Sequence, residues 1–362
     1  MTVDAVGGVW RYAVDAARGL ACRGVECLLV GFGPKPSAAA SAEVSAIEGA
    51  RLVWLDSPLD WLAPEEHMLS RIGPELEDLA LGHGCTLLHL NAPSQAVGLK
   101  GHLPVVVASH SCVVTWWQAM RDEPLPAAWR WQRARNTLGL SAADAVMAPS
   151  HSHAAALRTA YRLPRRIEVV HNASVPRLAT EERQPMALAA GRWWDAGKNG
   201  EVLDAAAALV PFPVVLAGAL EGPDGGRFEP RHAVAGGLLE PCQLYAAMGR
   251  AGVFVAPSRY EPFGLAVLEA AGTGAALVLA DIPTFRELWH DAALFCPPES
   301  PEAFATAMKL LVGDQALREQ LGAAASGRAR CFTGERQTEG LLAVYASFFE
   351  AAATAPASAE AS

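Results

Sequence analysis

Two carboxylates flank the start of an expected helix in the stretch APSRYEPFGLAVLEA. A β-rich run ends at Pro257, a polar loop carries Glu261, and the helix is expected to begin near Phe263 and Gly264, with Glu269 inside it. The neighbours of Glu269 are apolar on every side, so the helix must be buried. Its carboxylate then needs partners, because burying it unpaired is costly. Sugar hydroxyls can donate hydrogen bonds to a carboxylate without removing its charge.

The backbone at this helix start offers a second kind of contact. The N–H groups of Phe263, Gly264 and Leu265 suit phosphate or sugar oxygens, because they have no partner within the helix and glycine permits close approach. A structural interpretation fits the same sequence: Glu261 would cap the helix and Glu269 would pair with an arginine.

Two cations frame another loop, in the stretch MALAAGRWWDAGKNGEVLDAAAAL. Arg192 and Lys198 lie between the end of a strand and the start of a helix, where open α/β sheets bind ligands. Arginine offers a planar fork and lysine a point charge, so the two together can hold a diphosphate. Two basic residues alone are more often part of a solvated loop. Their occurrence together with the glutamates favours a binding site.

Two further candidates come from the first half of the chain. His110 ends an apolar run that begins at Val105, so it can face a cleft, although a lone histidine there is more often a packed, hydrogen-bonded residue. Gly7 and Gly8 precede an amphipathic helix, but only residues 2–5 remain to form the strand before them.

Aromatic and basic side chains gather between residues 115 and 138. Trp116, Trp117 and Arg121 are candidates for stacking on an acceptor sugar or for touching a lipid surface. The alternative is an ordinary helix whose tryptophans pack inward while its arginines are solvated. Acidic residues and prolines interrupt any continuous basic face, which favours the alternative.

The elements that must position these residues alternate between strands and helices, which predicts parallel sheets covered by helices. The alternation pauses in a polar stretch with two prolines at residues 172–185, and a second series of strands follows. Two such halves make a cleft between them. The expected strands lie at residues 25–31, 51–55, 86–90, 105–110, 145–150 and 167–171, and then at 186–191, 214–218, 253–257, 276–280 and 293–296.

The composition narrows the class of protein. Hydrophobic residues make up 51% of the chain and charged residues 19%, which is enough apolar surface for ordinary cores. The net charge of -9 argues against a nucleic-acid partner, because phosphate-backbone affinity depends on clustered lysine and arginine. The seven cysteines lack the spacing of zinc or redox pairs, and no run has the character of a signal peptide or membrane span. We therefore expect a cytoplasmic protein with at most peripheral membrane contact.

Taken together, these motifs resemble the family 4 (group 1) retaining glycosyltransferases. The family has the GT-B fold, an α/β architecture in which two Rossmann-like parallel-sheet domains face each other across a cleft. The most specific element is the pattern E-x-F-G-x-x-x-x-E, met here by Glu261, Phe263, Gly264 and Glu269.

Other parts of the family pattern are also present. Gly191–Arg192 with Lys198–Asn199 is similar to the family's phosphate loop, and Gly237 and Leu238, within residues 235–238, look like the loop that contacts the base.

The resemblance implies a role for each matching position. Arg192 and Lys198 would neutralise the diphosphate, Glu261 would hold the sugar and Glu269 the ribose. His110 would contact the donor sugar from the other wall of the cleft, where the first glycine loop would approach the diphosphate. The candidate catalytic residues are His110, Glu261, Arg192 and Lys198; the candidate donor-binding residues are Gly7, Gly8, Arg192, Lys198, Gly237, Leu238, Glu261, Phe263, Gly264, Leu265 and Glu269; the candidate acceptor-binding residues are Trp116, Trp117 and Arg121.

The implied reaction is a retaining, metal-independent transfer of a hexose from a UDP-, GDP- or ADP-sugar to a hydroxyl of a small-molecule, glycan or lipid-linked acceptor. No cofactor is then required, and the chain has no Asp-x-Asp metal motif. A non-catalytic subunit of the same fold, or a nucleotide-sugar epimerase, would bind the same donor. A dehydrogenase is disfavoured because no full glycine fingerprint is present.

The sequence divides into four expected segments. Residues 1–176 would form an acceptor-side Rossmann-like domain whose first strand is short or truncated, and residues 177–335 would form the nucleotide-sugar-binding domain. Residues 336–353 would be a helix that crosses back to the first domain, and residues 354–362 a disordered tail.

Overall fold

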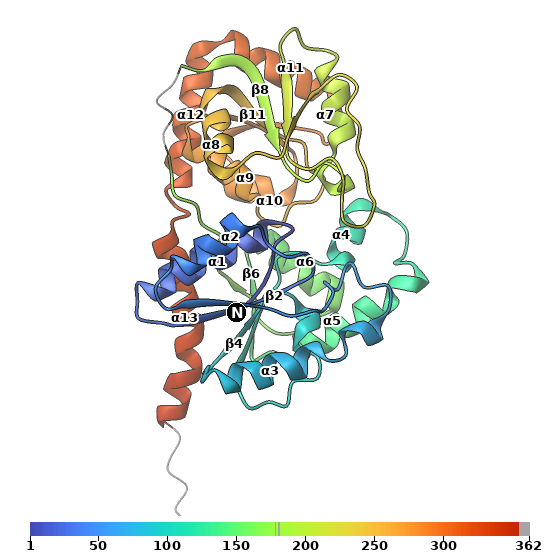
Figure 1. Cartoon of the computed structure of the whole chain (residues 1–362). Coiled ribbons are helices and arrows are strands. Elements are labelled where there is room, and N and C mark those ends of the chain that lie inside the picture. The colour runs from blue at the N-terminus through green and yellow to red at the C-terminus, as the bar shows by residue number, and fades with distance from the viewer. Residues whose placement is uncertain (178, 180–181, 355–362) are drawn as a thin grey trace, which may run out of the picture.

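The computed structural model describes residues 1–177, 179 and 182–354, and places side chains up to residue 349. Two halves lie one above the other, each built on parallel strands with helices around them (Figure 1). Every ladder between the named strands is parallel. The prediction of a GT-B architecture with two Rossmann-like halves is confirmed.

The first half contains two adjoining sheets, ordered β1-β2-β3 and β4-β5-β6-β7. Asn91 joins them: its side-chain amide donates a hydrogen bond to the Thr2 carbonyl oxygen at 2.6 Å, and its backbone N–H donates to Thr2 Oγ1 at 2.7 Å. The strands are β1 (Thr2–Asp4), β2 (Cys27–Phe32), β3 (Ala50–Trp54), β4 (Leu88–Leu90), β5 (Val105–Ala108), β6 (Ala145–Ala148) and β7 (Glu168–Val169). The helices are α1 (Gly8–Ala21), α2 (Ala38–Ser45), α3 (Ile72–Gly82), α4 (Val113–Met120), α5 (Arg130–Ala142) and α6 (His151–Tyr161).

The second half is built on one sheet, ordered β10-β9-β8-β11-β12-β13. The strands are β8 (Gln184–Ala190), β9 (Val214–Ala217), β10 (Val234–Gly237), β11 (Ala251–Ala256), β12 (Ala276–Ala280) and β13 (Ala293–Cys296). The helices are α7 (Gly200–Ala207), α8 (Pro241–Arg250), α9 (Leu265–Gly272), α10 (Pro283–Trp289), α11 (Pro301–Gly313), α12 (Gln315–Ala329) and α13 (Gly334–Thr354).

The central strands are apolar along their whole length because helices cover both faces of each sheet. In the second half, every residue of β11 and β12 is buried. In the first half the same holds for β2 and β5. Their carboxyl ends point toward the other half, so the loops that follow them carry the candidate site.

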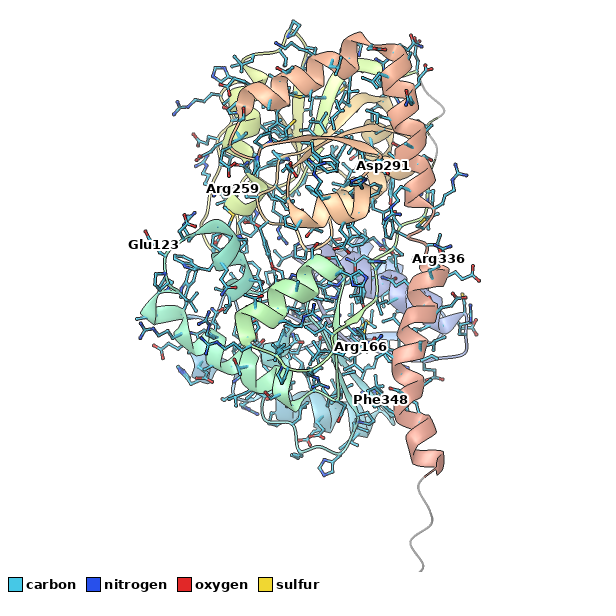
Figure 2. All side chains as sticks on the ribbon, turned by 180° about the vertical axis from the view of Figure 1, so that it is seen from behind. Glu123, Arg166, Arg259, Asp291, Arg336 and Phe348 are labelled. Atoms are coloured by element: carbon cyan, nitrogen blue, oxygen red, sulfur yellow. The ribbon has the colours of Figure 1, made fainter. Side chains whose placement is uncertain are left out.

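The last helix, α13, returns to the first half. It follows α12 of the second half and packs against α1, with Leu341 and Tyr345 in the same apolar cluster as Val14. Seen from behind, Arg336 lies near the start of α13 and Phe348 near its far end, beside the first half (Figure 2). Among the described residues, no helix is long and apolar enough to cross a membrane.

The chain crosses between the halves twice, and the two crossings lie side by side. The Ser174 N–H, on the first crossing, donates a hydrogen bond to the Phe332 carbonyl oxygen, on the second, at 3.2 Å. The Phe332 ring also packs against His171, with ring centroids 5.2 Å apart, and against Phe263, at 5.6 Å. The two crossings are therefore fastened to each other next to the loop that carries the E-x-F-G pattern.

The structure corrects several element boundaries. Residues 234–237, expected within a loop, form β10 because they pair with β9. The strands expected at 105–110 and 145–150 end at Ala108 and Ala148, because the ladder pairing of each strand stops there. The C-terminal helix extends to Thr354, so the prediction that the disordered tail begins at this residue is wrong. The rest of the expected tail, residues 355–362, lies outside the described residues.

Candidate active site

The loop after β8 carries both candidate cations. Asp195 shapes it by accepting a hydrogen bond from the Gly197 N–H at 2.8 Å, which starts a short 3-10 turn ending at Lys198. Arg192 Nη2 lies 3.4 Å from the Asp195 carboxylate, and its guanidinium lies 5.7 Å from the centre of the Trp194 ring. The Arg192 Nε is buried without a partner among the described residues. The guanidinium group of Arg192 is therefore held in place and still has N–H donors available for a ligand.

The loop after β11 brings Glu261 to the same place. Its carboxylate forms an ion pair with Lys198 Nζ, and both side chains are largely covered. The helix start depends on Gly264, whose φ of 93° is a conformation that favours glycine. A Cβ there would lie 3.4 Å from Glu261 Cγ and 3.0 Å from the Phe285 ring. Gly264, and not Glu261, is the cap residue of α9, so the alternative in which Glu261 caps the helix does not hold.

The other residues of the E-x-F-G pattern have distinct places. Phe263 is buried, and its ring packs on Phe332, so only its backbone is available to the loop. The first N–H groups of α9, which begins at Leu265, have no partner within the helix and are available to an anion.

The glycine loop of the first half closes over this arrangement. A Cβ on Gly7 would overlap Arg192 Nη1, and a Cβ on Gly8 would lie 3.1 Å from Leu265 Cδ1. The absence of side chains on Gly7 and Gly8 leaves room for Arg192 and Leu265 to approach this loop in their present positions. The structure brings together the first glycine loop, Arg192, Lys198, Glu261 and the start of α9.

Glu269 lies further along α9, facing α1. Burial raises the pKa of its carboxyl to about 7; Asp15 of α1 acts in the same direction, while Arg11, Arg177 and a hydrogen bond with Tyr245 oppose the shift. The carboxyl is therefore only partly ionised at neutral pH. Hydroxyl donors from a ligand would favour the ionised form.

A buried polar network holds His110 behind the glycine loop. The Asn91 amide donates to the Thr2 carbonyl oxygen, so its Oδ1 faces the histidines, 3.0 Å from His110 Nε2 and 3.2 Å from His89 Nε2. His89 Nδ1 in turn lies 2.6 Å from the hydroxyl of Tyr345 on α13.

The charge state of His110 follows from this setting. Burial lowers its pKa to about 3, and His153 contributes in the same direction, so the ring is neutral at physiological pH. Because Oδ1 is an acceptor, Nε2 carries the ring proton and donates to it. The Nδ1 atom is then an acceptor, suited to a sugar hydroxyl. Asn91 itself was missed in the sequence, although it follows β4 as His110 follows β5.

The remaining candidates lie at the rim. Gly237 ends β10, and Leu238 after it is 81% exposed, so it presents an apolar side chain to solvent beside the end of β9. Trp116 donates its indole N–H to Asp195 at 3.0 Å, which links α4 to the loop of Arg192.

The other two acceptor candidates make internal contacts. Trp117 donates its indole N–H to the Glu123 carbonyl oxygen at 2.8 Å. The Arg121 guanidinium lies 5.9 Å from the centre of the Trp117 ring and 6.0 Å from that of Trp116. Both tryptophans therefore make contacts within the protein, and both are half-buried.

Contacts across the two halves involve further residues, outside the candidate donor-binding and acceptor-binding sets. The Tyr260 hydroxyl lies 2.8 Å from Thr115 Oγ1, and Ser150 Oγ donates to the Pro262 carbonyl oxygen at 2.7 Å. Glu287 of α10 accepts hydrogen bonds from the backbone N–H groups of His151, at 2.8 Å, and Ser152, at 2.7 Å. These contacts fasten the loop of Glu261 and helix α10 to the first half.

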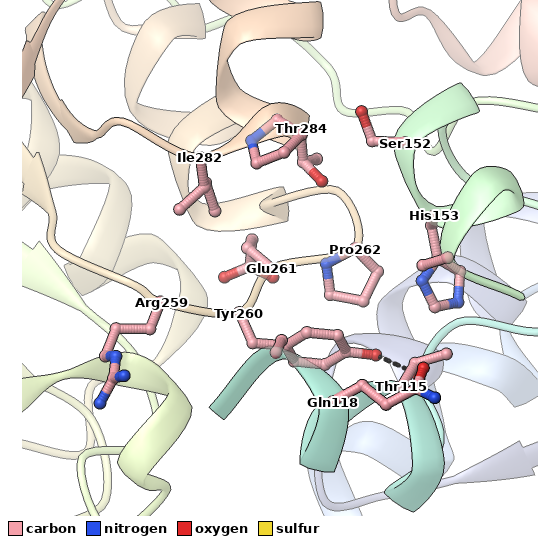
Figure 3. A pocket seen from close by; sticks show the side chains of 13 residues that line it. Thr115, Gln118, Ser152, His153, Arg259, Tyr260, Glu261, Pro262, Ile282 and Thr284 are labelled. Atoms are coloured by element: carbon pink, nitrogen blue, oxygen red, sulfur yellow. Dashed lines mark hydrogen bonds between the residues drawn. The ribbon is translucent and has the colours of Figure 1, made fainter. Parts of the chain in front are cut away.

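A pocket of about 250 Å³ lies at this junction (Figure 3). Its walls come from α4, α6, the loop 259–262 and the start of α10. Tyr260 and Glu261 line it, whereas His110 and Arg192 do not. Arg259, also on its wall, lies at the level where the two halves meet (Figure 2).

Family comparison agrees with this division into halves. The family model described as "Glycosyltransferase Family 4" matches residues 6–174, and that described as "Glycosyl transferases group 1" matches residues 231–328. The chain belongs to the family 4 (group 1) glycosyltransferases. The first match holds the glycine loop and His110 of this glycosyltransferase, and the second holds Glu261 and Glu269.

Solved structures share the GT-B fold of this glycosyltransferase. Sucrose-phosphate synthase from Thermosynechococcus elongatus is similar with a TM-score of 0.79 at 19% identity, over 97% of this chain and 99% of that chain. Alr3699/HepE from Anabaena in complex with UDP-glucose has a TM-score of 0.71 at 16% identity, over 96% and 99%.

Curated relatives match this glycosyltransferase over shorter spans. The D-inositol 3-phosphate glycosyltransferase of Jonesia denitrificans is 35% identical over 91 residues, which are 25% of this chain and 22% of that protein. The glycogen synthase of Mycobacterium tuberculosis is 35% identical over 94 residues, 25% of this chain and 23% of that protein. The matched segments thus span roughly a quarter of these relatives' length.

Proposed function

We propose that this chain transfers a hexose from a nucleotide-diphosphate sugar to a hydroxyl acceptor, with retention and without a metal ion. The observation that carries the proposal is the ion pair of Lys198 with Glu261 beside Arg192, whose guanidinium reaches Gly7 of the other half. Cations fixed in a cleft between two domains stabilise the charge that grows on a leaving diphosphate.

Each group then has a defined task. Arg192 and Lys198 bind the diphosphate, whose charge competes with Glu261 for the ammonium group. Glu261, released in part from Lys198, accepts hydrogen bonds from the donor sugar. His110, neutral and with Nδ1 as an acceptor, binds another sugar hydroxyl from the opposite wall.

In the proposed step, the bond between the anomeric carbon and the diphosphate oxygen breaks, and the acceptor oxygen attacks from the same face. The departing phosphate oxygen takes the acceptor's proton, so no protein nucleophile is needed. Glu269 holds the ribose, and the end of β10, at Gly237 and Leu238, lies beside the base. Trp116, Trp117 and Arg121 remain the proposed acceptor-side residues.

The donor base is proposed to be uracil, guanine or adenine. A UDP-sugar has support from one structural neighbour, Alr3699/HepE, which is described as a complex with UDP-glucose. The acceptor is proposed to be a small molecule, a glycan or a lipid-linked glycan.

The test is a thermal-shift screen of the purified chain against UDP-, GDP- and ADP-sugars, followed by mass spectrometry of the products. A donor present at one hundred times its Kd stabilises the folded protein by about 2.7 kcal/mol. The expected result is a shift with one nucleotide series, together with a glycoside or, without acceptor, slow release of the free sugar. Binding without turnover favours a non-catalytic subunit, and an epimerised nucleotide sugar without glycoside favours an epimerase.

A further inference from the structure

Tyr260 lies directly before Glu261, yet its hydroxyl contacts the first half. That hydroxyl is 2.8 Å from Thr115 Oγ1 (Figure 3). It also lies 3.3 Å from Ser111 Oγ. Thr115 donates its own hydroxyl proton to the Cys112 carbonyl oxygen at 3.1 Å. The Tyr260 O–H is therefore the donor to Thr115, and Ser111 can donate to Tyr260.

The surroundings keep this hydroxyl in its neutral form. Burial raises the pKa of Tyr260 well above its ordinary value. Leaving a buried hydroxyl without a hydrogen-bond partner costs free energy. Separation of the two halves would therefore either expose the Tyr260 hydroxyl to water or leave it without a partner.

The Glu261 loop is held on both sides of the glutamate. On one side Tyr260 binds the start of α4, and on the other Ser150 donates to the Pro262 carbonyl oxygen at 2.7 Å. Behind them, the Arg259 N–H donates to the Gly197 carbonyl oxygen at 2.9 Å, next to Lys198. The position of Glu261 is therefore set jointly by the phosphate loop and by the first half.

The contact also connects the two walls of the site. Ser111 is the residue after His110, and Tyr260 is the residue before Glu261. The hydrogen bond between Ser111 and Tyr260 thus links the chain neighbours of His110 and Glu261, the two residues that flank the proposed sugar position.

We propose that Tyr260 is a positioning residue. Its hydroxyl, hydrogen-bonded to Thr115 and Ser111, aligns Glu261 with His110 when the two halves are together. This inference rests on the proposed function. Tyr260 itself does not touch the reacting atoms; it acts through Glu261.

The test compares Tyr260→Phe, Thr115→Val and the double variant with the wild-type chain. The reaction is release of free sugar from UDP-glucose, GDP-mannose or ADP-glucose, which needs no identified acceptor. We expect Tyr260→Phe to lower kcat about tenfold, equivalent to about 1.4 kcal/mol. The Kd for UDP, GDP or ADP is expected to change less than about twofold, since the phosphate loop is untouched. The double variant is expected to lose no more than the larger single loss, because both changes remove one contact.

Tyr161→Phe is the matched control. Its hydroxyl binds Asn136 and Cys112, each at 3.1 Å, entirely within the first half. It loses a buried hydroxyl as Tyr260→Phe does, and its kcat is expected to stay within about twofold of wild type.

Hydrogen exchange gives a second readout that needs no turnover. In Tyr260→Phe, backbone exchange is expected to rise in two segments on opposite halves, 111–116 and 259–263. In Tyr161→Phe it is expected to stay unchanged at 259–263, because the Tyr161 hydroxyl contacts Cys112 of the first half and not the second half. Wild-type kcat in Tyr260→Phe, additive losses in the double variant, or exchange unchanged in both segments overturns the inference. A wild-type chain that releases sugar from none of the three donors instead overturns the proposed function.

Discussion

Replacing Glu287 with alanine removes a carboxylate that crosses from α10 to the start of α6. It accepts hydrogen bonds from the His151 and Ser152 N–H groups and from Ser152 Oγ, at 2.8, 2.7 and 2.6 Å. A hydrogen bond to a charged group contributes about 1.5–3 kcal/mol, and a charge at a helix N-terminus about 0.3–1 kcal/mol more. Water can replace part of this in the half-buried site, so we expect a loss of about 2–4 kcal/mol in the free energy of unfolding.

The variant Glu287→Gln removes the charge of this side chain but keeps its size, so it separates the contribution of the charge to stability from that of the side chain's shape. Its amide oxygen can still accept from one N–H, but its NH2 group cannot accept from the other, so the expected loss is roughly half that of alanine. The matched control is Asp291→Ala, just after the same helix, whose side chain is 93% exposed and pairs with His290 at 2.8 Å. Its free energy of unfolding is expected to change by less than about 0.5 kcal/mol.

The assay is urea unfolding followed by tryptophan fluorescence, combined with hydrogen exchange at residues 151 and 152. We expect both the midpoint and the protection of these two amides to fall in Glu287→Ala. An unfolding free energy equal to that of Asp291→Ala, with protection unchanged, would show that the α6 terminus does not depend on this carboxylate.

Four further changes test the site. Lys198→Ala is expected to lower sugar transfer about 100- to 1000-fold, as loss of a charge-stabilising group does, while Lys309→Ala on the surface of α11 leaves the rate unchanged; equal rates for the two contradict the assignment. His110→Ala is expected to reduce turnover more than nucleoside-diphosphate affinity, and equal losses in both measurements point to a structural role. Because burial raises the pKa of Glu269 to about 7, its ionisation destabilises the fold progressively as the pH rises from its ordinary pKa through 7. Glu269→Gln is therefore expected to raise Tm relative to wild type at pH 8.5 but not at pH 4, and to lose the rise in nucleotide affinity expected of wild type as the pH increases toward 7; the same Tm difference at both pH values refutes this. Gly264→Ala forces a φ of 93° on an L-residue and is expected to cost about 1–3 kcal/mol, measured by thermal unfolding, together with most of the transfer activity; Gly327→Ala, where a Cβ meets nothing within 4 Å, is the control.

The regular part of the fold was accessible from the sequence because buried parallel strands leave continuous apolar runs. The run expected at residues 276–280 coincides with β12, and that at 293–296 with β13. Strand β10 was not predicted from the sequence, because Val234–Gly237 contains two glycines and lies at a sheet edge, where most of its residues are exposed. A short, exposed edge strand has no periodic burial to reveal it.

The site divides in the same way. Lys198 and Glu261 follow adjacent strands, β8 and β11, and the structure pairs them, as the carboxyl-end rule for parallel sheets implies. The contacts of Tyr260 and Ser150 could not be found by that rule, because their partners come from the opposite half. The contacts between the two halves depend on how the folded halves pack together, and the spacing of residues along the sequence does not reveal that packing.

The bond between Ser174 and Phe332 has a consequence for how the molecule can move. Two chain segments tied at one place permit rotation about a single axis through that place, and resist translation of one half past the other. Displacement grows with distance from the axis, so the contact between Trp116 and Asp195 is expected to separate further than contacts beside Phe332. In Figure 1, α4 lies on the side of the molecule opposite α13, which makes its tryptophans natural fluorescent reporters of opening.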